Sequence, residues 1–312
     1  MIEKKLLITG GLGFAGKHFY KLHVNKWKKI LIYDKMTYAA DKAFINQYIN
    51  KKKDKIIIGD ILDKKKLEKY IDKNTCVVHF AAESHVDNSF ETSLIFTNTN
   101  TLGTHKLLEI CRLKKPYKII VISTDEVYGE SFKSYKNENS RLQPTNPYSA
   151  SKASADLISQ TYMLTFKLPI CILRPNNLYG ERQYIEKIIP AIINSITYKK
   201  ILKIHGKGKT IRRFLHVDDL SVAIELLIKK SKTGEIYNIG GKFKIQIYEL
   251  VKLCFGLSKS KMSRLCKFVK DRPFNDYDYK INDKKIKRLG WKENKNFKIE
   301  IKKLLEKKSI LK

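Results

Sequence analysis

The chain has 312 residues, enough for one large α/β unit or two closely packed domains. Its 63 Lys and Arg residues against 31 Asp and Glu residues give a formal net charge of +32, which favours an anionic partner. The excess is mainly scattered lysine without a helix-turn-helix, zinc or RNA-binding signature, so specific nucleic-acid binding is left as a minor alternative.

Short apolar runs rich in Ile and Val recur along the first half, and each is followed by a stretch long enough for a helix. They cover residues 5–9, 30–33, 56–58, 77–80, 119–123 and 170–173. Continuous rather than alternating hydrophobicity is typical of strands that are buried on both faces. We therefore predict an α/β fold, a Rossmann-like doubly wound parallel sheet covered by helices.

The rhythm of strand and helix breaks after Arg174. We expect a helix around 188–196. A strand-like piece near Phe214, a helix 217–229 and residues 237–241 are expected to return to the sheet. A C-terminal amphipathic helix is expected to contain Phe297, Ile301 and Leu304. The predicted division is a Rossmann-like domain, 1–174 plus about 211–241, and a smaller lobe, about 175–210 plus 242–312.

The cysteines and the hydropathy pattern concern the cellular compartment. Five cysteines, with no CxxC spacing, lie largely in apolar runs, as reduced buried thiols do. No apolar run approaches the roughly 20 residues that a membrane helix needs. We predict a cytoplasmic protein without membrane contact or a metal site.

A glycine motif follows the first predicted strand. Gly10, Gly13 and Gly16 form GxxGxxG, which allows a tight turn, close approach of a pyrophosphate and a helix N-terminus that faces it. Asp34, 18 positions after Gly16, ends the second strand, where its carboxylate can accept both ribose hydroxyls and repel a 2′-phosphate. The motif predicts NAD rather than NADP, although Lys35 weakens the exclusion. A glycine-rich turn with surface acids is the alternative reading.

Polar residues at the ends of later strands extend this site. Asp60 and Ile61 end the third strand and are expected near the adenine, while Ala81, Ala82 and Ser84 end the fourth and are expected on the nicotinamide side. Lys17, one residue after the motif, is expected to attract the pyrophosphate.

The catalytic candidates lie at the fifth strand and the helix after it. Tyr148 and Lys152 are four residues apart in a predicted helix 147–166, so they share a face. The lysine, with a positively charged nicotinamide nearby, is expected to lower the pKa of the phenol. Thr124 can hydrogen-bond a reacting hydroxyl. Asp125 and Glu126 can act as one acid and one base if their pKa values differ, although two acids in a turn are usually only solvated.

The chain resembles the dTDP-glucose 4,6-dehydratase family and its UDP-glucose relatives. The matching stretches span nearly the whole length and are GGLGFAG, DKMTYAA, GDI, HFAAESHVDNS, TNTLGT, STDEVYGE, NPYSASKA, RPNNLYGERQ, IHGKGKTIRRFLHVDD, YNIGG and DRPFNDYDY. The resemblance implies that Tyr148, assisted by Lys152 and Thr124, takes the proton of the sugar 4-hydroxyl as hydride leaves carbon 4. Glu126 would then deprotonate carbon 5 while Asp125 protonates the departing 6-hydroxyl, and hydride returns to carbon 6.

The same resemblance implies further binding residues. For NAD these add Phe14, Ala15, Thr37 and Thr99. For the sugar nucleotide they are Ser84, His85, Thr124, Asn177, Lys187, Ile188, His205, Arg212, Asn238, Arg272 and Tyr279. The two arginines suit bidentate phosphate recognition, although surface salt bridging explains either one about as well.

The nucleotide base stays open between two. The stretches MTYAA, AAES and YSASKAS are closer to the dTDP enzymes, whereas Asn88, His205 and residues 273–276 are closer to the UDP-glucose relatives. We predict dTDP-glucose as substrate, with UDP-glucose as the alternative. Further alternatives are a 4-epimerase or decarboxylase, which do not need the acid pair, and a non-catalytic basic binding protein. The resemblance also implies a homodimer paired through the helices near 103–113 and 149–166.

Overall fold

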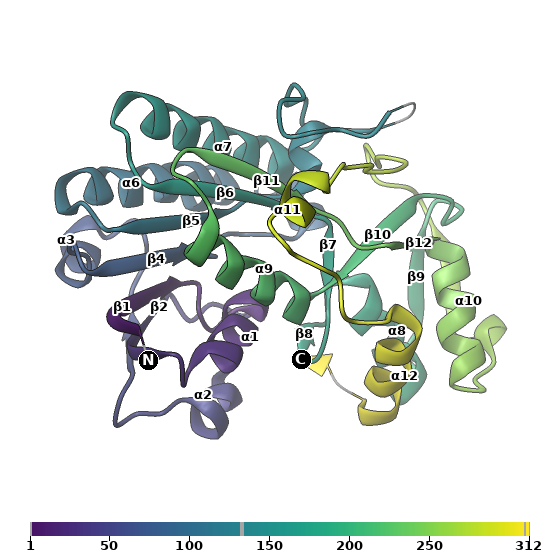
Figure 1. The fold of residues 1–312 in the computed structure, drawn as a ribbon. Coiled ribbons are helices and arrows are strands. Elements are labelled where there is room, and N and C mark those ends of the chain that lie inside the picture. The colour runs from purple at the N-terminus through teal and green to yellow at the C-terminus, as the bar shows by residue number, and fades with distance from the viewer. Residues whose placement is uncertain (1, 132–133, 309, 312) are drawn as a thin grey trace.

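The computed structural model describes residues 2–131, 134–308 and 310–311. Its centre is a seven-stranded sheet of order β11-β6-β5-β4-β1-β2-β3, in which all neighbouring strands run parallel (Figure 1). The strands are β1 (Ile2–Thr9), β2 (Trp27–Asp34), β3 (Lys55–Ile58), β4 (Thr75–His79), β5 (Lys118–Ile122), β6 (Ile170–Pro175) and β11 (Glu235–Ile239). The predicted doubly wound parallel sheet is confirmed, and the strand order reverses between β1 and β4.

Helices cover both faces of this sheet because successive strand residues point to opposite sides. On β1, Leu6 and Ile8 join one buried core and Leu7 joins the other. The first core is closed by α1 (Phe14–His23), α2 (Lys42–Tyr48), α9 (Val217–Lys230) and α11 (Lys284–Arg288). The second is closed by α3 (Lys64–Leu67), α6 (Gly103–Lys114) and α7 (Pro147–Thr165). The continuous apolar runs of the sequence correspond to this two-sided burial.

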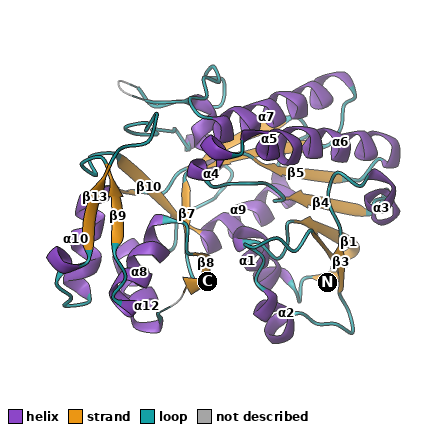
Figure 2. Ribbon diagram, turned by 180° about the vertical axis from the view of Figure 1, so that it is seen from behind, coloured by secondary structure: helices purple, strands orange, loops and turns teal. Residues whose placement is uncertain are grey.

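Short helical segments link the fourth strand to α6 and the fifth to α7. Helices α4 (Val86–Glu91) and α5 (Ser93–Phe96) and the π-helical turn η2 (Thr97–Leu102) lead into α6, as Figure 2 shows for α4 and α5. The turns η1 (Glu68–Tyr70), η3 (Asp125–Tyr128) and η4 (Met262–Arg264) are 3₁₀ helices.

A smaller lobe stands beside the carboxyl ends of the large sheet. It contains three small sheets, β7 (Asn177–Tyr179) with β10 (Ile211–His216) and β12 (Phe243–Gln246), β9 (Leu202–His205) with β13 (Cys266–Val269), and β8 (Gln183–Tyr184) with β14 (Ile310–Leu311). Helices α8 (Ile188–Tyr198), α10 (Ile247–Leu257) and α12 (Phe297–Lys307) complete its core. The predicted helices around 188–196 and at the C-terminal end are confirmed.

One part of the sequence interpretation is wrong. The strand near Phe214 does not return to the large sheet, because β10 pairs with β7 and β12 instead. Residues 235–239 do return, as β11 beside β6. In addition, Ile286 and Trp291 pack into the core of the large sheet although they belong to the predicted smaller lobe. The division into two domains stays a prediction.

The cysteines and helices bear on the compartment. All five cysteines lie in the described part of the chain and are free thiols, four of them buried and Cys266 half-buried. Within the described ranges, no helix is both long and apolar enough to cross a membrane.

A buried ion pair connects α7 to the end of β6. Both nitrogens of the Arg174 guanidinium that face Asp156 donate to its carboxylate, at 2.9 and 2.7 Å, and the two residues are each 1% exposed. Arg174 also donates to the Tyr128 hydroxyl at 2.6 Å. A buried charge is tolerated only with such partners, so the pair fixes α7 against the sheet.

We expect Asp156→Ala to lower the free energy of unfolding by about 3–5 kcal/mol, because it leaves the Arg174 guanidinium buried without its carboxylate. Urea unfolding followed by circular dichroism measures the loss. Replacing both partners with apolar residues, Asp156→Leu with Arg174→Met, should recover part of it. Glu3→Ala, which removes an exposed ion pair with Lys28, is the control and should leave the midpoint unchanged. A loss from Asp156→Ala no larger than the control's would contradict this account.

Candidate active site

A cavity of about 430 Å³ lies where the carboxyl ends of the parallel strands meet the smaller lobe. Segments from both lobes line it, including the turns after β1, β2, β4 and β5 and the loops around β7, β8 and β9. Ligands of open α/β sheets bind at this edge, where the strand order reverses. The cavity therefore lies where folds of this class bind their ligands.

Several buried polar atoms facing this cavity have no hydrogen-bond partner among the described residues. They are Ser123 Oγ, Asn176 Oδ1, Asn177 Nδ2, His205 Nδ1 and Asp276 Oδ1. Buried polar groups are normally hydrogen-bonded in folded proteins. Unsatisfied atoms from both lobes at one cavity indicate a polar ligand.

The glycine motif forms the turn between β1 and α1. Gly10 has φ +65°, and a Cβ there would lie 2.6 Å from the backbone nitrogen of Ala81. A Cβ on Gly16 would lie 2.4 Å from the carbonyl oxygen of Gly10. Gly13 caps the N-terminus of α1, whose first turn has no acidic residue. The turn therefore brings free backbone N–H groups to the cavity wall, which suits the pyrophosphate of a dinucleotide.

Lys17 does not take part in this cradle. Its side chain is 1% exposed and points away from the cavity lining, where its ammonium donates to Asp41 at 2.9 Å and to the carbonyl oxygen of Arg182 at 2.7 Å. The expectation that Lys17 attracts the pyrophosphate is wrong, because two buried oxygens already hold its charge.

Asp34 lies at the cavity wall at the end of β2. Its two carboxylate oxygens accept the backbone N–H groups of Leu12, at 2.9 Å, and Met36, at 2.7 Å. Burial raises the pKa of Asp34, and these hydrogen bonds oppose the rise. Each oxygen keeps a free lone pair for a ribose hydroxyl. Lys35 is paired with Asp60 at 2.8 Å, so its charge is partly neutralised rather than available to a 2′-phosphate.

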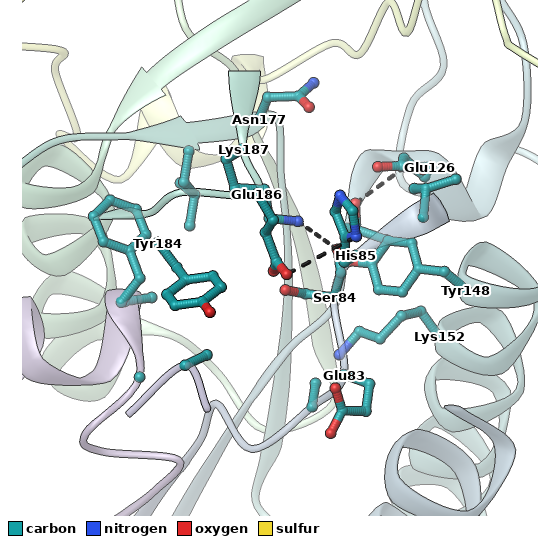
Figure 3. Close-up of a pocket in the computed structure, with 18 of the residues that line it drawn as sticks. Glu83, Ser84, His85, Glu126, Tyr148, Lys152, Asn177, Tyr184, Glu186 and Lys187 are labelled. Atoms are coloured by element: carbon teal, nitrogen blue, oxygen red, sulfur yellow. Dashed lines mark hydrogen bonds and ion pairs between the residues drawn. The ribbon is translucent and has the colours of Figure 1, made fainter. Parts of the chain in front are cut away.

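The five catalytic candidates meet at one side of the cavity. Thr124 caps the turn η3; its Oγ accepts the backbone N–H of Glu126 at 3.3 Å and donates to Asp125 at 3.1 Å. Tyr148 and Lys152 come from the first turns of α7, on the right of Figure 3 with Glu126 above them. Thus the end of β5 and the start of α7 present Thr124, both acids and the Tyr–Lys pair to the same space.

The two adjacent acids have different partners. Burial raises the pKa of Asp125 to about 7 and Glu126 adds to the rise, while hydrogen bonds from Asn176, at 2.5 Å, and Thr124 oppose it. Burial also raises the pKa of Glu126, but the positive charges of Arg212 and Lys187 favour its carboxylate form. The two acids therefore lie in different electrostatic surroundings, which favours a division into one acid and one base.

Burial shifts the pKa values of both members of the Tyr–Lys pair. Burial raises the pKa of Tyr148, and the charges of Glu126 and Asp125 add to the rise against a hydrogen bond with Thr124. Lys152 donates to the carbonyl oxygen of Ile122 at 2.6 Å, and burial lowers its pKa to about 8. The predicted lowering of the phenol pKa, which relies on a positively charged nicotinamide as well as on Lys152, stays a prediction.

The cationic candidates of the smaller lobe also face the cavity. Arg272 forms a two-point ion pair with Asp87, at 2.6 and 3.0 Å, which fixes the guanidinium at the wall. Arg212 donates to the carbonyl oxygen of Asp276 at 2.9 Å, and its guanidinium lies 5.2 Å from the ring centre of Tyr279. Lys187 donates to the carbonyl oxygen of Ser84 and thereby bridges the lobes (Figure 3). These groups provide a positively charged wall opposite the glycine turn.

Apart from Lys17, the structure brings together all but one of the residues that the sequence selected. The cavity lining includes the NAD candidates Phe14, Ala15, Thr37, Ile61, Ala82 and Thr99 and the substrate candidates His85, Asn177, Ile188 and His205. Asn238 is the exception. It is fully buried behind the site, where it accepts from the Tyr128 hydroxyl at 2.8 Å and donates to the carbonyl oxygens of Lys136 and Asn282.

The sequence interpretation missed several lining residues, four of which stand out by their polar side chains. Glu83 and Glu186 face the cavity, Tyr184 forms its far wall in Figure 3, and Asn176 holds Asp125. Glu83, Asn176 and Glu186 each precede a selected residue in the chain. Position next to a selected residue in an irregular loop, where neighbouring side chains can face the same space, is the signal that could have found them.

Comparison with known proteins agrees with this arrangement. The family model described as GDP-mannose 4,6 dehydratase matches residues 7–304. A dTDP-D-glucose 4,6-dehydratase of Homo sapiens is 39% identical over 97% of this chain and 89% of the relative. The chain belongs to the dTDP-glucose 4,6-dehydratase family.

Further members of this family and its relatives match nearly the full length of this chain. The Dictyostelium discoideum dTDP-D-glucose 4,6-dehydratase is 38% identical, covering 93% of this chain and 78% of the relative. A trifunctional Arabidopsis thaliana enzyme that includes UDP-glucose 4,6-dehydratase is 37% identical over 97% of this chain and 47% of its own length. The crystal structure of DesIV, a dTDP-glucose 4,6-dehydratase from Streptomyces venezuelae with NAD bound, has a TM-score of 0.93 at 33% identity, covering 97% and 96% of the two chains.

We expect the carboxyl group of Asp125 to titrate near pH 7 in the protein without substrate. In Glu126→Gln its pKa should fall, because a neighbouring like charge is removed. Infrared difference spectra of the protonated carboxyl band across pH measure both, with Asp125→Asn as the control that lacks the band. A titration near pH 4, or one that Glu126→Gln leaves in place, would contradict the assignment.

Proposed function

We propose that the chain catalyses the NAD-dependent dehydration of dTDP-glucose to dTDP-4-keto-6-deoxyglucose. The observation that carries the proposal is the acid pair Asp125 and Glu126 at the same cavity wall as Tyr148 and Lys152. A simple 4-epimerase needs the Tyr–Lys pair but has no step for two further carboxyl groups. The relatives named as dehydratases support the proposal.

The cofactor side of the cavity fits NAD. The glycine turn can take the pyrophosphate and Asp34 the ribose hydroxyls, while the ion pair with Asp60 partly neutralises Lys35, the cation next to Asp34. Bound NAD supplies the acceptor for the hydride from carbon 4 and its donor to carbon 6. The remaining roles belong to side chains of this chain.

Tyr148 takes the proton of the sugar 4-hydroxyl, and the Thr124 hydroxyl orients that group. Lys152, fixed by the Ile122 carbonyl, supplies positive charge beside the phenol. Since the acids raise the pKa of Tyr148, the proton transfer needs a further positive charge near the phenol, which the oxidised nicotinamide carries.

Elimination of water then divides the work between the acids. Glu126 removes the proton of carbon 5, which the ketone at carbon 4 acidifies, since Arg212 and Lys187 favour its ionised form. Asp125 delivers a proton to the departing 6-hydroxyl, since its pKa of about 7 keeps it largely protonated below neutral pH. Water loss should therefore slow as pH rises through about 7.

The diphosphate is proposed to lie at Arg212, Arg272 and Lys187, whose side chains share one wall of the cavity. We propose dTDP as the nucleotide on the basis of the dTDP-specific names of the full-length relatives. UDP-glucose is the second candidate, because the 37% identical Arabidopsis relative is named for it.

We expect Glu126→Gln to abolish water loss while substrate still reduces bound NAD, because the variant keeps Tyr148 and Lys152 and loses only the base for carbon 5. Absorbance of the reduced cofactor at 340 nm should rise and persist in the variant, whereas the reduced cofactor should not accumulate in the wild type. Tyr148→Phe is the matched control and should block the absorbance change itself. Full dehydration by Glu126→Gln would contradict the assignment of Glu126 as the general base for carbon 5.

Mass spectrometry of the pure wild-type protein with dTDP-glucose and with UDP-glucose tests the overall reaction. A product lighter by one water supports it, and the faster substrate identifies the base. An isomer of unchanged mass would support a 4-epimerase instead, and no change with retained NAD would support a non-catalytic binding protein.

We further propose a cytoplasmic homodimer. Apolar side chains lie exposed along α5, η2, α6 and α7 and directly after α7. They are Leu94, Ile95, Leu102, Leu113, Leu157, Leu164 and Phe166. The helices α5, α6 and α7 lie together at the top of Figure 2. Leu157 and Leu164 are seven residues apart on α7 and so share its outer face. An apolar face of this extent favours burial against a second copy.

Leu164→Glu, at a side chain 70% exposed, should shift the protein from dimer to monomer, because a charge would have to be buried in the interface. Sedimentation velocity measures the state. Ile201→Glu, equally apolar and exposed but in the smaller lobe, should leave the dimer intact. A wild-type monomer, or a dimer in Leu164→Glu, would contradict the proposed interface.

A further inference from the structure

Residues 35–41, here termed the strap, follow β2 and form part of the cavity wall. Lys35, Thr37, Ala39 and Ala40 of the strap line the cavity beside Asp34. The strap belongs to the lobe that carries the glycine turn. On the proposed function, it covers the adenosine half of the dinucleotide.

One end of the strap is joined to the smaller lobe by a buried ion cluster. Arg182, in the loop between β7 and β8, donates to both oxygens of Asp41, at 2.6 and 2.5 Å. Asp41 is fully buried and also accepts from Lys17 of α1, whose ammonium in turn reaches the carbonyl oxygen of Arg182. One carboxylate thus joins α1, the strap and the smaller lobe.

The charges in this cluster are mutually dependent. Burial alone would raise the pKa of Asp41, but hydrogen bonds from Arg182 and Lys17 lower it to about 2. Burial lowers the pKa of Lys17 to about 8, and Asp41 opposes that shift. Since burying an ammonium without an anion is costly, Asp41 has little freedom to leave Lys17. The strap end is therefore held to α1 by Lys17 and to the smaller lobe by Arg182.

A second set of contacts joins the middle of the strap to the same lobe. The Tyr38 hydroxyl donates to Glu186 at 3.2 Å, and its ring lies edge-on to Tyr184, 5.2 Å between ring centres. Asn88 donates to the same hydroxyl at 3.5 Å. Tyr184 and Glu186 lie across the cavity from Lys152 in Figure 3. The strap is thus attached at two points, one on either side of the cavity-lining Ala39 and Ala40.

We propose that Arg182 and Tyr38 are positioning residues that hold the strap closed over the dinucleotide and slow its release. The inference rests on the proposed function. It adds that a cofactor reduced in the first step remains in place for the last because contacts between the lobes must break before it can leave. Neither side chain lines the cavity, so each acts through the strap.

The test is the dissociation rate of NADH, followed by its fluorescence when the loaded protein is mixed with excess NAD. Arg182→Gln should raise the rate on the order of tenfold or more, since charge-assisted hydrogen bonds of this kind contribute about 1.5–3 kcal/mol and 1.4 kcal/mol is tenfold. Arg182→Lys should restore part of the retention. The apparent KM for NAD should rise in Arg182→Gln, while kcat at saturating NAD stays unchanged.

Arg182→Gln keeps the pair of Lys17 with Asp41, so its unfolding midpoint should stay near that of the wild type. Tyr38→Phe, at a half-exposed position, removes the hydroxyl that bonds Glu186 while keeping the ring beside Tyr184. It should also speed release, which keeps the test decisive if Arg182→Gln folds poorly. Arg264→Gln, an exposed arginine of the smaller lobe, is the matched control and should not change the rate.

The outcomes separate the two proposals. Wild-type rates in both Arg182→Gln and Tyr38→Phe would overturn the strap inference and leave the proposed function standing. A wild-type protein that binds neither NADH nor NAD would overturn the proposed function and the inference with it. Faster release in the two variants, with Arg264→Gln unchanged, supports the inference.

Discussion

The hydrogen bond from the Lys152 ammonium to the Ile122 carbonyl joins the two segments that make the catalytic wall. Ile122 is the last residue of β5, directly before the segment that carries Thr124, Asp125 and Glu126, and Lys152 stands one helical turn beyond Tyr148. Because the bond is buried and charge-assisted, it fixes the distance between the strand end and the helix. The relative placement of the phenol and the two acids depends on this contact.

A second layer of buried charged groups lies behind that wall and supports it. Asp156, one turn after Lys152 on α7, favours the charged form of that lysine and forms the two-point pair with Arg174. Arg174 donates to Tyr128, and Tyr128 donates to Asn238. Asn238 therefore belongs to the support of the site rather than to its surface. A chain of satisfied polar groups of this kind gives a rigid backing in which the catalytic carboxyl groups can stay buried and perturbed.

The sequence was sufficient where a property depends on neighbours along the chain. Two-sided burial of strands such as 119–122 follows from their continuous hydrophobicity, and the Tyr148–Lys152 spacing gives a shared helix face. It was insufficient where distant segments decide. The partner strand of Phe214, the burial of Lys17 against Asp41 and the position of Asn238 depend on contacts across tens of residues or more. The raised pKa of Tyr148 likewise depends on the burial of its phenol in the assembled site and on the charges of Glu126 and Asp125 beside it.

Lys17 shows how one such distant contact changes the meaning of a motif. A lysine directly after a glycine motif would add attraction for phosphate if it faced the cavity, and would then favour any phosphorylated ligand. Its ammonium instead neutralises Asp41, so the backbone N–H groups of the turn are left as the binding element and the positive charge holds the two lobes together. Selectivity for a dinucleotide and retention of that dinucleotide are thereby assigned to different groups. A reaction that borrows a hydride and returns it needs both, because a cofactor lost after the first step would leave the sugar oxidised and the cycle incomplete.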